Sequence, residues 1–275
     1  MKTLLYTIIG TYLNTISYIS KTYAANSAIH LFSKPRKGKV TQEQDDFLGT
    51  AFQEELKFEN YPIMTYRWLG KKDTILLVHG WESNTSRWKN LVLTLKQKGH
   101  NVVALDAPAH GYSGSKIFNA ILYSEFINKV SKHFQPKIII GHSIGGMATV
   151  FCQYKYQLQS VQKLILIGVP SEFTGLLKRY TDMLGYNQRI INQINAVVIE
   201  RFGAEPTTFS TAKYLENMNS KGLIIHDEED MIIPYSDALQ IKNSFKDSTL
   251  ITTKGLGHSL NNDTVASYIY DFIEA

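Results

Sequence analysis

The sequence predicts an α/β protein with a mostly parallel, doubly wound sheet, because strand-like and helix-like segments alternate along most of the chain. Two of the strand-like segments, Ile75–Val78 and Ile138–Ile140, are continuous apolar runs. Such runs are typical of parallel strands that are buried on both faces. Stretches of helical length lie between the strands, which favours an open sheet covered by helices on both sides.

The expected elements follow in order from β-rich composition and from helix-length spacing. Strands are expected at 63–68, 74–79, 101–106, 137–142, 163–169, 222–227 and 248–253. Helices are expected at 85–98, 117–134, 146–157 and 235–245. Before the first strand, Thr41 and Gln44 have the spacing of a capping box, which predicts a helix from there to about Lys57.

The interval from Ser171 to Lys221 breaks this alternation. It contains several helical patterns and no convincing strand, and Gly175, Gly185 and Gly203 interrupt it. An insert of this length between two core strands predicts a helical cap or lid. The alternative is a pair of ordinary packing helices.

The composition excludes several classes of protein. With 44% hydrophobic and 12% aromatic residues, a chain of 275 residues can bury a core and is not disordered. The single cysteine, Cys152, rules out an internal disulfide, so no oxidising compartment is required. We therefore expect a cytoplasmic protein.

The net charge of +5 is concentrated at one end of the chain. Residues 1–40 contain six lysines and arginines and no acidic residue, whereas residues 41–275 contain 23 basic and 24 acidic residues. Because a nucleic-acid-binding domain usually carries its own basic surface, no nucleic-acid partner is expected.

The N-terminal residues show an amphipathic helical pattern. Apolar side chains from Leu5 to Tyr23 fall on one side of a helix wheel, and the threonines, Asn14 and Lys21 fall on the other. The main interpretation is a helix that packs on the body of the protein. One alternative is a helix on a membrane surface, with the basic residues at 34–39 near anionic headgroups. Another is a targeting peptide of an exported or organellar protein.

The most specific functional motif is Gly141-His142-Ser143-Ile144-Gly145-Gly146, which follows an apolar strand and precedes a helix-forming segment. This is the G-x-S-x-G pattern in a strand–turn–helix context, where the serine lies on a tight, strained turn. Glycines are needed there because neighbouring Cβ atoms would clash with the strand or the helix. We therefore predict that Ser143 is a nucleophile at the carboxyl edge of the sheet.

A serine nucleophile needs a base, and the base needs an acid that orients it. His258 follows the last expected strand, beside flexible glycines, and is the only histidine downstream of the candidate acids. The acid is expected in the segment Asp227–Pro234, where Asp230 is preferred and Asp227 is the alternative. No metal-ligand spacing accompanies these carboxylates, so neither a metal nor a cofactor is expected.

Residues after the strand at 74–79 complete the predicted site. The backbone N–H groups of Trp81 and Ile144 are expected to form a two-donor oxyanion hole. Gly80 allows the chain to turn close to the substrate, and we assign Gly80 and His142 to the substrate pocket. In the loop after the next strand, Asp106 and His110 are expected to be structural.

Together these segments resemble the α/β-hydrolase superfamily, in its esterase and lipase-like branch. The resemblance covers about residues 58–275 and depends on the segments 79–81, 106–113, 141–146, 230–234 and 257–258. It implies a sheet of about eight strands, a cap after the sixth strand, and a triad of Ser143, Asp230 and His258. The resemblance therefore favours Asp230 over Asp227.

The expected organisation is an N-terminal amphipathic helical extension of residues 1–57, followed by a catalytic domain of residues 58–275 with the cap at 171–221. The expected function is that of a serine hydrolase which cleaves a small or lipid-like acyl ester or thioester through an acyl-enzyme intermediate. One alternative is a lipase or lysophospholipase-like enzyme that contacts a membrane through residues 1–40. Another is a non-catalytic, ligand-binding member of the fold. The sequence alone determines neither the substrate nor the oligomeric state.

Overall fold

The protein forms two compact units in a computed structural model, which describes residues 2–275 and the side chains from Leu4 onward. The sheet unit comprises Pro35–Ser171 and Thr211–Ala275. The helical unit comprises the chain up to Lys34 together with Glu172–Ser210. Within the described residues, no helix is long and apolar enough to cross a membrane.

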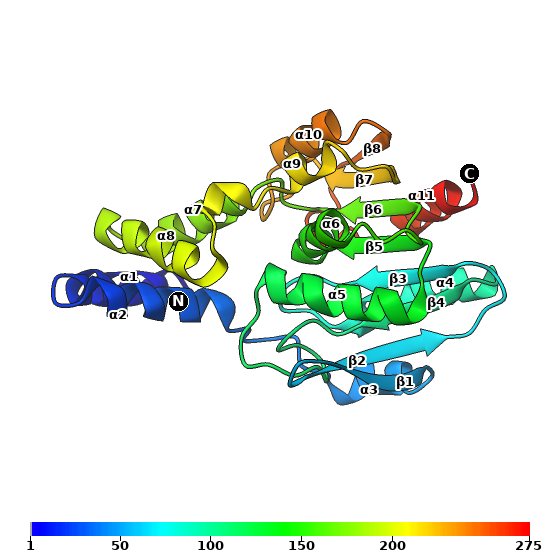
Figure 1. Ribbon diagram of the computed structural model, residues 1–275, viewed down its shortest axis with the longest axis horizontal. Helices are drawn as coiled ribbons and strands as arrows, with labels where there is room; N and C mark the ends of the chain where they lie inside the picture. The colour runs from blue at the N-terminus through cyan, green and yellow to red at the C-terminus, as the bar shows by residue number, and fades with distance from the viewer. Residues whose placement is uncertain (1) are drawn as a thin grey trace. The chain divides into compact units, whose positions relative to one another are not determined.

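One eight-stranded sheet, in the order β1-β2-β4-β3-β5-β6-β7-β8, forms the centre of the sheet unit (Figure 1). The strands are β1 (Phe52–Phe58), β2 (Tyr61–Trp68), β3 (Thr74–Val78), β4 (Asn101–Leu105), β5 (Ile138–His142), β6 (Lys163–Ile167), β7 (Lys221–Asp227) and β8 (Ser248–Thr253). β2 pairs antiparallel with β1 and β4, and all the other neighbouring strands are parallel. The predicted fold class is therefore confirmed.

Helices cover both faces of this sheet. They are α3 (Gln42–Leu48), α4 (Lys89–Gln97), α5 (Ala120–Phe134), α6 (Ile144–Tyr156), α9 (Thr211–Leu215), α10 (Tyr235–Ser244) and α11 (Asp263–Glu274), with a 3₁₀ turn η1 (Thr85–Trp88). Figure 1 shows α5 and α6 in front of the sheet, with α4 and α11 behind it. Ile75 and Leu77 of β3 belong to the core that α4 and α11 complete.

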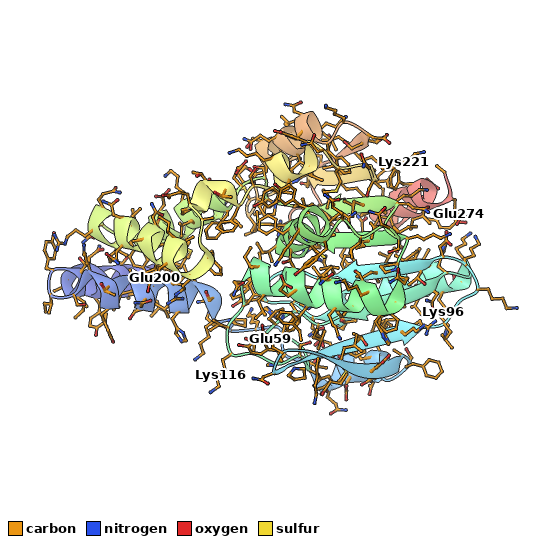
Figure 2. All side chains as sticks on the ribbon, viewed as in Figure 1. Glu59, Lys96, Lys116, Glu200, Lys221 and Glu274 are labelled. Atoms are coloured by element: carbon orange, nitrogen blue, oxygen red, sulfur yellow. The ribbon has the colours of Figure 1, made fainter. Side chains whose placement is uncertain are left out.

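The edge strand β1 differs from the prediction. The capping box of Thr41 and Gln44 is present, but the helix that it starts ends at Leu48, and residues 52–58 form a strand instead of the end of that helix. The first four residues of β1 are exposed, so no burial pattern in the sequence marks this strand. Strand β1 is held in the sheet by pairing with β2, to which a turn at Glu59 connects it. The Glu59 side chain is exposed (Figure 2).

The helical unit contains α1 (Lys2–Ser17), α2 (Lys21–Ser33), α7 (Phe173–Leu184), α8 (Gln188–Phe202) and a 3₁₀ turn η2 (Pro206–Thr208). The N-terminal amphipathic pattern is thus divided between two helices rather than carried by one. The Ser20 side chain caps α2 by accepting a hydrogen bond from the Tyr23 N–H. Serine is favoured at the start of a helix because its side-chain oxygen can accept from an N–H group that has no partner within the helix.

Small residues let the two pairs of helices of this unit pack closely. A Cβ at Gly10 would lie 1.7 Å from the Leu184 carbonyl oxygen, so only glycine fits where α1 crosses the end of α7. Asn14 donates to the Gly185 carbonyl at 2.8 Å and accepts from the Asn187 N–H at 2.8 Å. The buried residues of this core are Leu13, Ala24, Ala25, Ala28, Leu177, Leu184, Tyr186, Ile190, Ile194 and Val198.

The compact units divide the chain differently from the expected organisation. Residues 35–57 belong to the sheet unit, where Phe47 and Leu48 are buried in its core. The helical insert begins at Glu172 and ends at Ser210, whereas α9 belongs to the sheet unit. The N-terminal helices and the insert therefore share one hydrophobic core. The extension predicted at residues 1–57 is instead divided after Lys34 between the two units.

Candidate active site

Ser143 lies on a sharp turn between β5 and α6. Its backbone has φ of 53° and ψ of −130°, a conformation that costs a non-glycine residue free energy. The turn is held because the Ser143 N–H donates to the Ile167 carbonyl of the neighbouring strand β6 at 2.8 Å. The side chain is therefore presented at the carboxyl edge of the sheet, beside the N-terminus of α6, where backbone N–H groups favour negative charge.

The glycines around Ser143 are required by close backbone contacts. A Cβ at Gly141 would lie 2.5 Å from the Cα of Gly146, and a Cβ at Gly145 would lie 2.3 Å from the His79 carbonyl oxygen. Distances this short do not occur between real atoms, so larger residues would displace the strand or the helix. The local sequence thus has the residues that this turn demands.

Loops after three parallel strands bring Ser143, His258 and Asp230 together. The Ser143 Oγ lies 3.0 Å from the His258 Nε2, and the His258 Nδ1 lies 2.7 Å from the Asp230 Oδ2. Because an ionised carboxylate only accepts hydrogen bonds, the His258 proton is assigned to Nδ1. Nε2 is then free to accept the proton of the Ser143 hydroxyl, which is the arrangement a general base requires.

Asp230 is stabilised as a carboxylate by several donors. Its Oδ1 accepts from the backbone N–H groups of Ile232 at 2.8 Å and Ile233 at 2.9 Å. Burial acts to raise the pKa of the Asp230 carboxyl, but hydrogen bonds from His226, His258 and a backbone N–H lower it well below its usual value. The residue that faces His258 is therefore negatively charged at neutral pH.

Asp227, the alternative acid, has a different set of partners. Its side chain accepts from the Thr253 hydroxyl at 2.8 Å, the Leu256 N–H at 3.0 Å and the Glu229 N–H at 3.0 Å. These contacts tie the loop after β7 to the loop that carries His258. Asp227 is thus engaged in holding two loops together, whereas the His258 ring bonds to Asp230.

His226, at the end of the buried strand β7, is a further neighbour of Asp230. Its fully buried Nε2 lies 2.9 Å from the Ile233 carbonyl oxygen and 3.4 Å from the Asp230 Oδ2. Both neighbours are acceptors, so the Nε2 carries the proton and directs it towards them. A histidine four residues before the acid at a strand end is the signal that could have indicated this contact.

The Gly80–Trp81 segment lies against the nucleophile. A Cβ at Gly80 would lie 3.0 Å from the Ser143 Cβ, so glycine is needed for this close approach. In the described part of the chain, neither the Trp81 N–H nor the Ile144 N–H has a hydrogen-bond acceptor. One N–H group after Gly80 and one after Ser143 are thus left without an acceptor, as the donors of an oxyanion hole must be.

Two neutral histidines hold this segment in place. The buried His79 donates from Nδ1 to the Gly80 carbonyl at 2.8 Å, and its Nε2 accepts from the Ala107 N–H at 2.9 Å. The His110 Nε2 accepts from the Glu82 N–H at 3.0 Å. Burial lowers the pKa of both rings, and that of His79 lies well below its usual value. Each ring can therefore accept through one nitrogen at neutral pH.

Asp106 and His142 also have defined partners. The Asp106 carboxylate accepts from the Tyr66 hydroxyl at 2.8 Å, the Tyr112 N–H at 3.0 Å and the Thr85 N–H at 3.0 Å. The His142 Nε2 lies 2.9 Å from the His258 carbonyl oxygen, and burial lowers the pKa of His142 well below its usual value. His142, which was assigned to the substrate pocket, thus contacts the backbone of the candidate base.

The arrangement contains the kinds of group that nucleophilic catalysis uses. Acyl transfer uses a serine hydroxyl, a base that accepts its proton, a carboxylate bonded to that base, and two free N–H donors. Within residues 2–275, no group of three His, Cys, Asp or Glu side chains could hold a metal ion.

Comparisons with known proteins agree with this fold. A family model described as alpha/beta hydrolase fold matches residues 73–209. The chain belongs to the α/β-hydrolase superfamily. Membership of this superfamily supports a hydrolase, and the reaction has to be argued from the site because one fold serves many functions.

Individual relatives are distant but cover most of the chain. A non-heme haloperoxidase of Rhodococcus erythropolis is 24% identical over 76% of this chain and 95% of its own length. A non-heme chloroperoxidase of Burkholderia pyrrocinia is 25% identical over 79% of this chain and 98% of its own length. The solved structure of an esterase from Exiguobacterium antarcticum has a TM-score of 0.63 at 14% identity, covering 82% of this chain and all of that one. This last similarity shows the fold alone.

A prediction concerns His226, which we expect to keep the Asp230 carboxylate aligned with His258. His226→Leu should lower kcat about tenfold with KM nearly unchanged, because one hydrogen bond to a charged group is lost. His226→Gln retains a donor and should recover part of this loss. Steady-state kinetics and melting temperatures of both variants check the expectation. If His226→Gln lost as much kcat and as much melting temperature as His226→Leu, the role of His226 would be in core packing alone.

Proposed function

We propose that the protein is a serine hydrolase that cleaves a carboxylic ester or thioester through an acyl-enzyme intermediate. The observation that carries this proposal is the chain of two short distances, from the Ser143 Oγ to the His258 Nε2 at 3.0 Å and from the His258 Nδ1 to the Asp230 Oδ2 at 2.7 Å. The substrate is a small or lipid-like acyl compound, and the proposed reaction requires no cofactor.

Acylation begins when the Ser143 Oγ attacks the ester carbonyl and His258 accepts the hydroxyl proton. The negative charge that develops on the carbonyl oxygen is stabilised by the Trp81 and Ile144 N–H groups, and by the N-terminus of α6. Asp230 keeps the His258 proton on Nδ1 and stabilises the imidazolium. His258 then protonates the leaving alcohol or thiol, which departs and leaves the acyl group on Ser143.

Deacylation repeats these steps with water. His258 removes a proton from a water molecule, which attacks the acyl carbonyl, and then returns the proton to the Ser143 Oγ. Because the same donors stabilise both oxyanions, no movement of the sheet unit is required between the two halves of the reaction. We further propose that the helical insert, residues 172–210, acts as the cap that selects the acyl group.

A fluorophosphonate probe tests the proposal. Active protein should be labelled at Ser143, and p-nitrophenyl esters of graded acyl length should be hydrolysed with a preference that identifies the acyl group. Heat-denatured protein, as a control, should not be labelled because the serine is activated only by the folded arrangement. Folded protein that is neither labelled nor active on any acyl substrate, and that binds a ligand tightly, would favour the non-catalytic alternative.

A second candidate function is supported by the names of two relatives, a haloperoxidase and a chloroperoxidase. Hydrogen peroxide can replace water as the attacking group, in which case the acyl-enzyme releases a peracid and regenerates Ser143. The peracid oxidises a halide ion to hypohalous acid and is itself reduced to the carboxylic acid. Halogenation of an acceptor that requires both acetate and hydrogen peroxide would favour this candidate over simple hydrolysis.

A further inference from the structure

We propose that the α1–α2 hairpin docks the protein on an anionic lipid surface, which presents the lipid-like ester substrate. This inference deepens the proposed function, because it names the assembly from which the substrate comes. It is carried by an exposed apolar face and by the distribution of charge within the helical unit.

One face of α1 is apolar and uncovered. Leu5, Ile8 and Tyr12 are 51%, 57% and 56% exposed, and they follow one another at helical spacing. A neighbouring face of the helix carries Leu13, which is 3% exposed and packs in the core of the helical unit. The hairpin therefore has two apolar faces, and only one of them is covered by the protein.

The exposed apolar surface continues around the hairpin turn and along α2. Tyr18 and Ile19 in the turn are 72% and 84% exposed, and Tyr23 on α2 is 57% exposed. Among the described residues, eight of the twenty exposed large hydrophobic side chains lie between Leu4 and Leu31. Single exposed hydrophobics are ordinary, but a concentration of this kind marks a binding surface.

The charge around this surface is positive. α1 and α2 contain lysines and no acidic residue, and the acidic residues of the helical unit lie on its other segments, as Glu200 on α8 does (Figure 2). At the turn, the Arg189 guanidinium lies 5.2 Å from the centre of the Tyr18 ring. An aromatic residue beside a cation, with aliphatic side chains next to them, suits the boundary between headgroups and acyl chains.

A groove beside this surface has the character of a site for hydrocarbon. It has a volume of about 460 Å³ and lies between α1 and α2. Its lining is mostly apolar, and it consists of Ile9, Tyr12, Leu13, Tyr23 and Leu31 together with the polar residues Asn26, Ser27 and His30. Its lining contains no acidic residue. We therefore commit to an anionic bilayer as the occupant of this face, since its apolar interior and negative headgroups match both features of the hairpin. The helix α1, with 16 residues, would lie in the plane of the interface.

Co-sedimentation of the full chain with vesicles tests the proposal. The protein should bind vesicles of phosphatidylcholine with phosphatidylglycerol, should bind pure phosphatidylcholine more weakly, and should be released by added salt. The double variant Ile8→Glu, Ile19→Glu should reduce binding by about tenfold or more, because charges replace two inserting side chains. The control Leu93→Glu alters a side chain of α4 that is 46% exposed, and it should bind like the parent protein.

Melting temperatures of the variants establish that they are folded, as expected for substitutions of exposed side chains. Equal vesicle binding by the parent and the double variant would overturn the proposal, and so would the absence of binding. A parent dimer that the double variant converts to a monomer would show that a second copy covers this face, and would overturn it as well. Vesicle binding without turnover of any ester would support the docking proposal and contradict the proposed hydrolase. Ester turnover without vesicle binding would support the hydrolase and contradict the docking proposal.

Discussion

Replacing Ser143 with alanine is expected to lower kcat for ester hydrolysis by about 10⁶-fold, which is the loss found when a nucleophilic serine is removed from a complete triad. The reason is that the alanine methyl group cannot form the acyl-enzyme, while the proposed oxyanion donors, the Trp81 and Ile144 N–H groups, should still contribute a small residual rate. Steady-state hydrolysis of p-nitrophenyl esters measures this loss. Mass spectrometry after fluorophosphonate treatment should at the same time show no adduct.

The stability of the position-143 variants provides the control. Among the described residues, the Ser143 hydroxyl hydrogen-bonds to His258 alone, so Ser143→Ala should melt close to the parent temperature. Ser143→Gly should be equally inactive but should melt at a higher temperature than Ser143→Ala, because glycine adopts a φ of 53° without strain. Hydrolysis that persists in both variants, in protein free of contaminating esterase, would place the nucleophile elsewhere.

Replacing Asp230 with asparagine is expected to lower kcat by about 10⁴-fold with KM little changed. An asparagine amide can offer its N–H₂ group to His258 and so favour the tautomer with its proton on Nε2, which cannot accept the Ser143 proton. The negative charge that stabilises the imidazolium is lost as well. The rate of fluorophosphonate labelling should therefore fall together with kcat.

Asp227→Asn provides a matched control three residues earlier. The Asp227 carboxylate holds Thr253 and the Leu256 N–H and makes no contact with the His258 ring. Its replacement should therefore lower the melting temperature while kcat falls far less than in Asp230→Asn. The opposite ranking, in which Asp227→Asn loses more activity, would make Asp227 the acid of the triad.

Much of the candidate site is encoded in short stretches of sequence. Gly141, Gly145 and Gly80 occur where a Cβ would clash with neighbouring backbone or side chains. The glycines of the motif around Ser143 therefore predict the tight turn at this residue. The parallel strands are also recognisable locally, because burial on both faces makes them continuous apolar runs. The edge strand β1 was missed for the same reason, since its exposed residues carry no such signal.

Contacts between distant segments depend on the tertiary structure. His226 is an ordinary strand histidine in the sequence, and it becomes a neighbour of the Asp230 carboxylate only because the loop after β7 turns back over the strand end. His79 and His110 likewise hold the Gly80–Glu82 segment through hydrogen bonds across 28 residues of chain. Such roles depend on the closure of loops, which no local pattern records.

The sequence by itself determined the α/β class, the strained turn at Ser143, and the location of the basic excess in the first 40 residues. These features depend on side-chain sterics, on apolar periodicity and on composition, which act over a few neighbouring residues. Only the tertiary structure decided that α1 and α2 share a core with α7 and α8, because that depends on surface fit between segments more than a hundred residues apart. Gly10 against Leu184 and the alanines of α2 make this fit, and they also determine which face of the hairpin is left exposed.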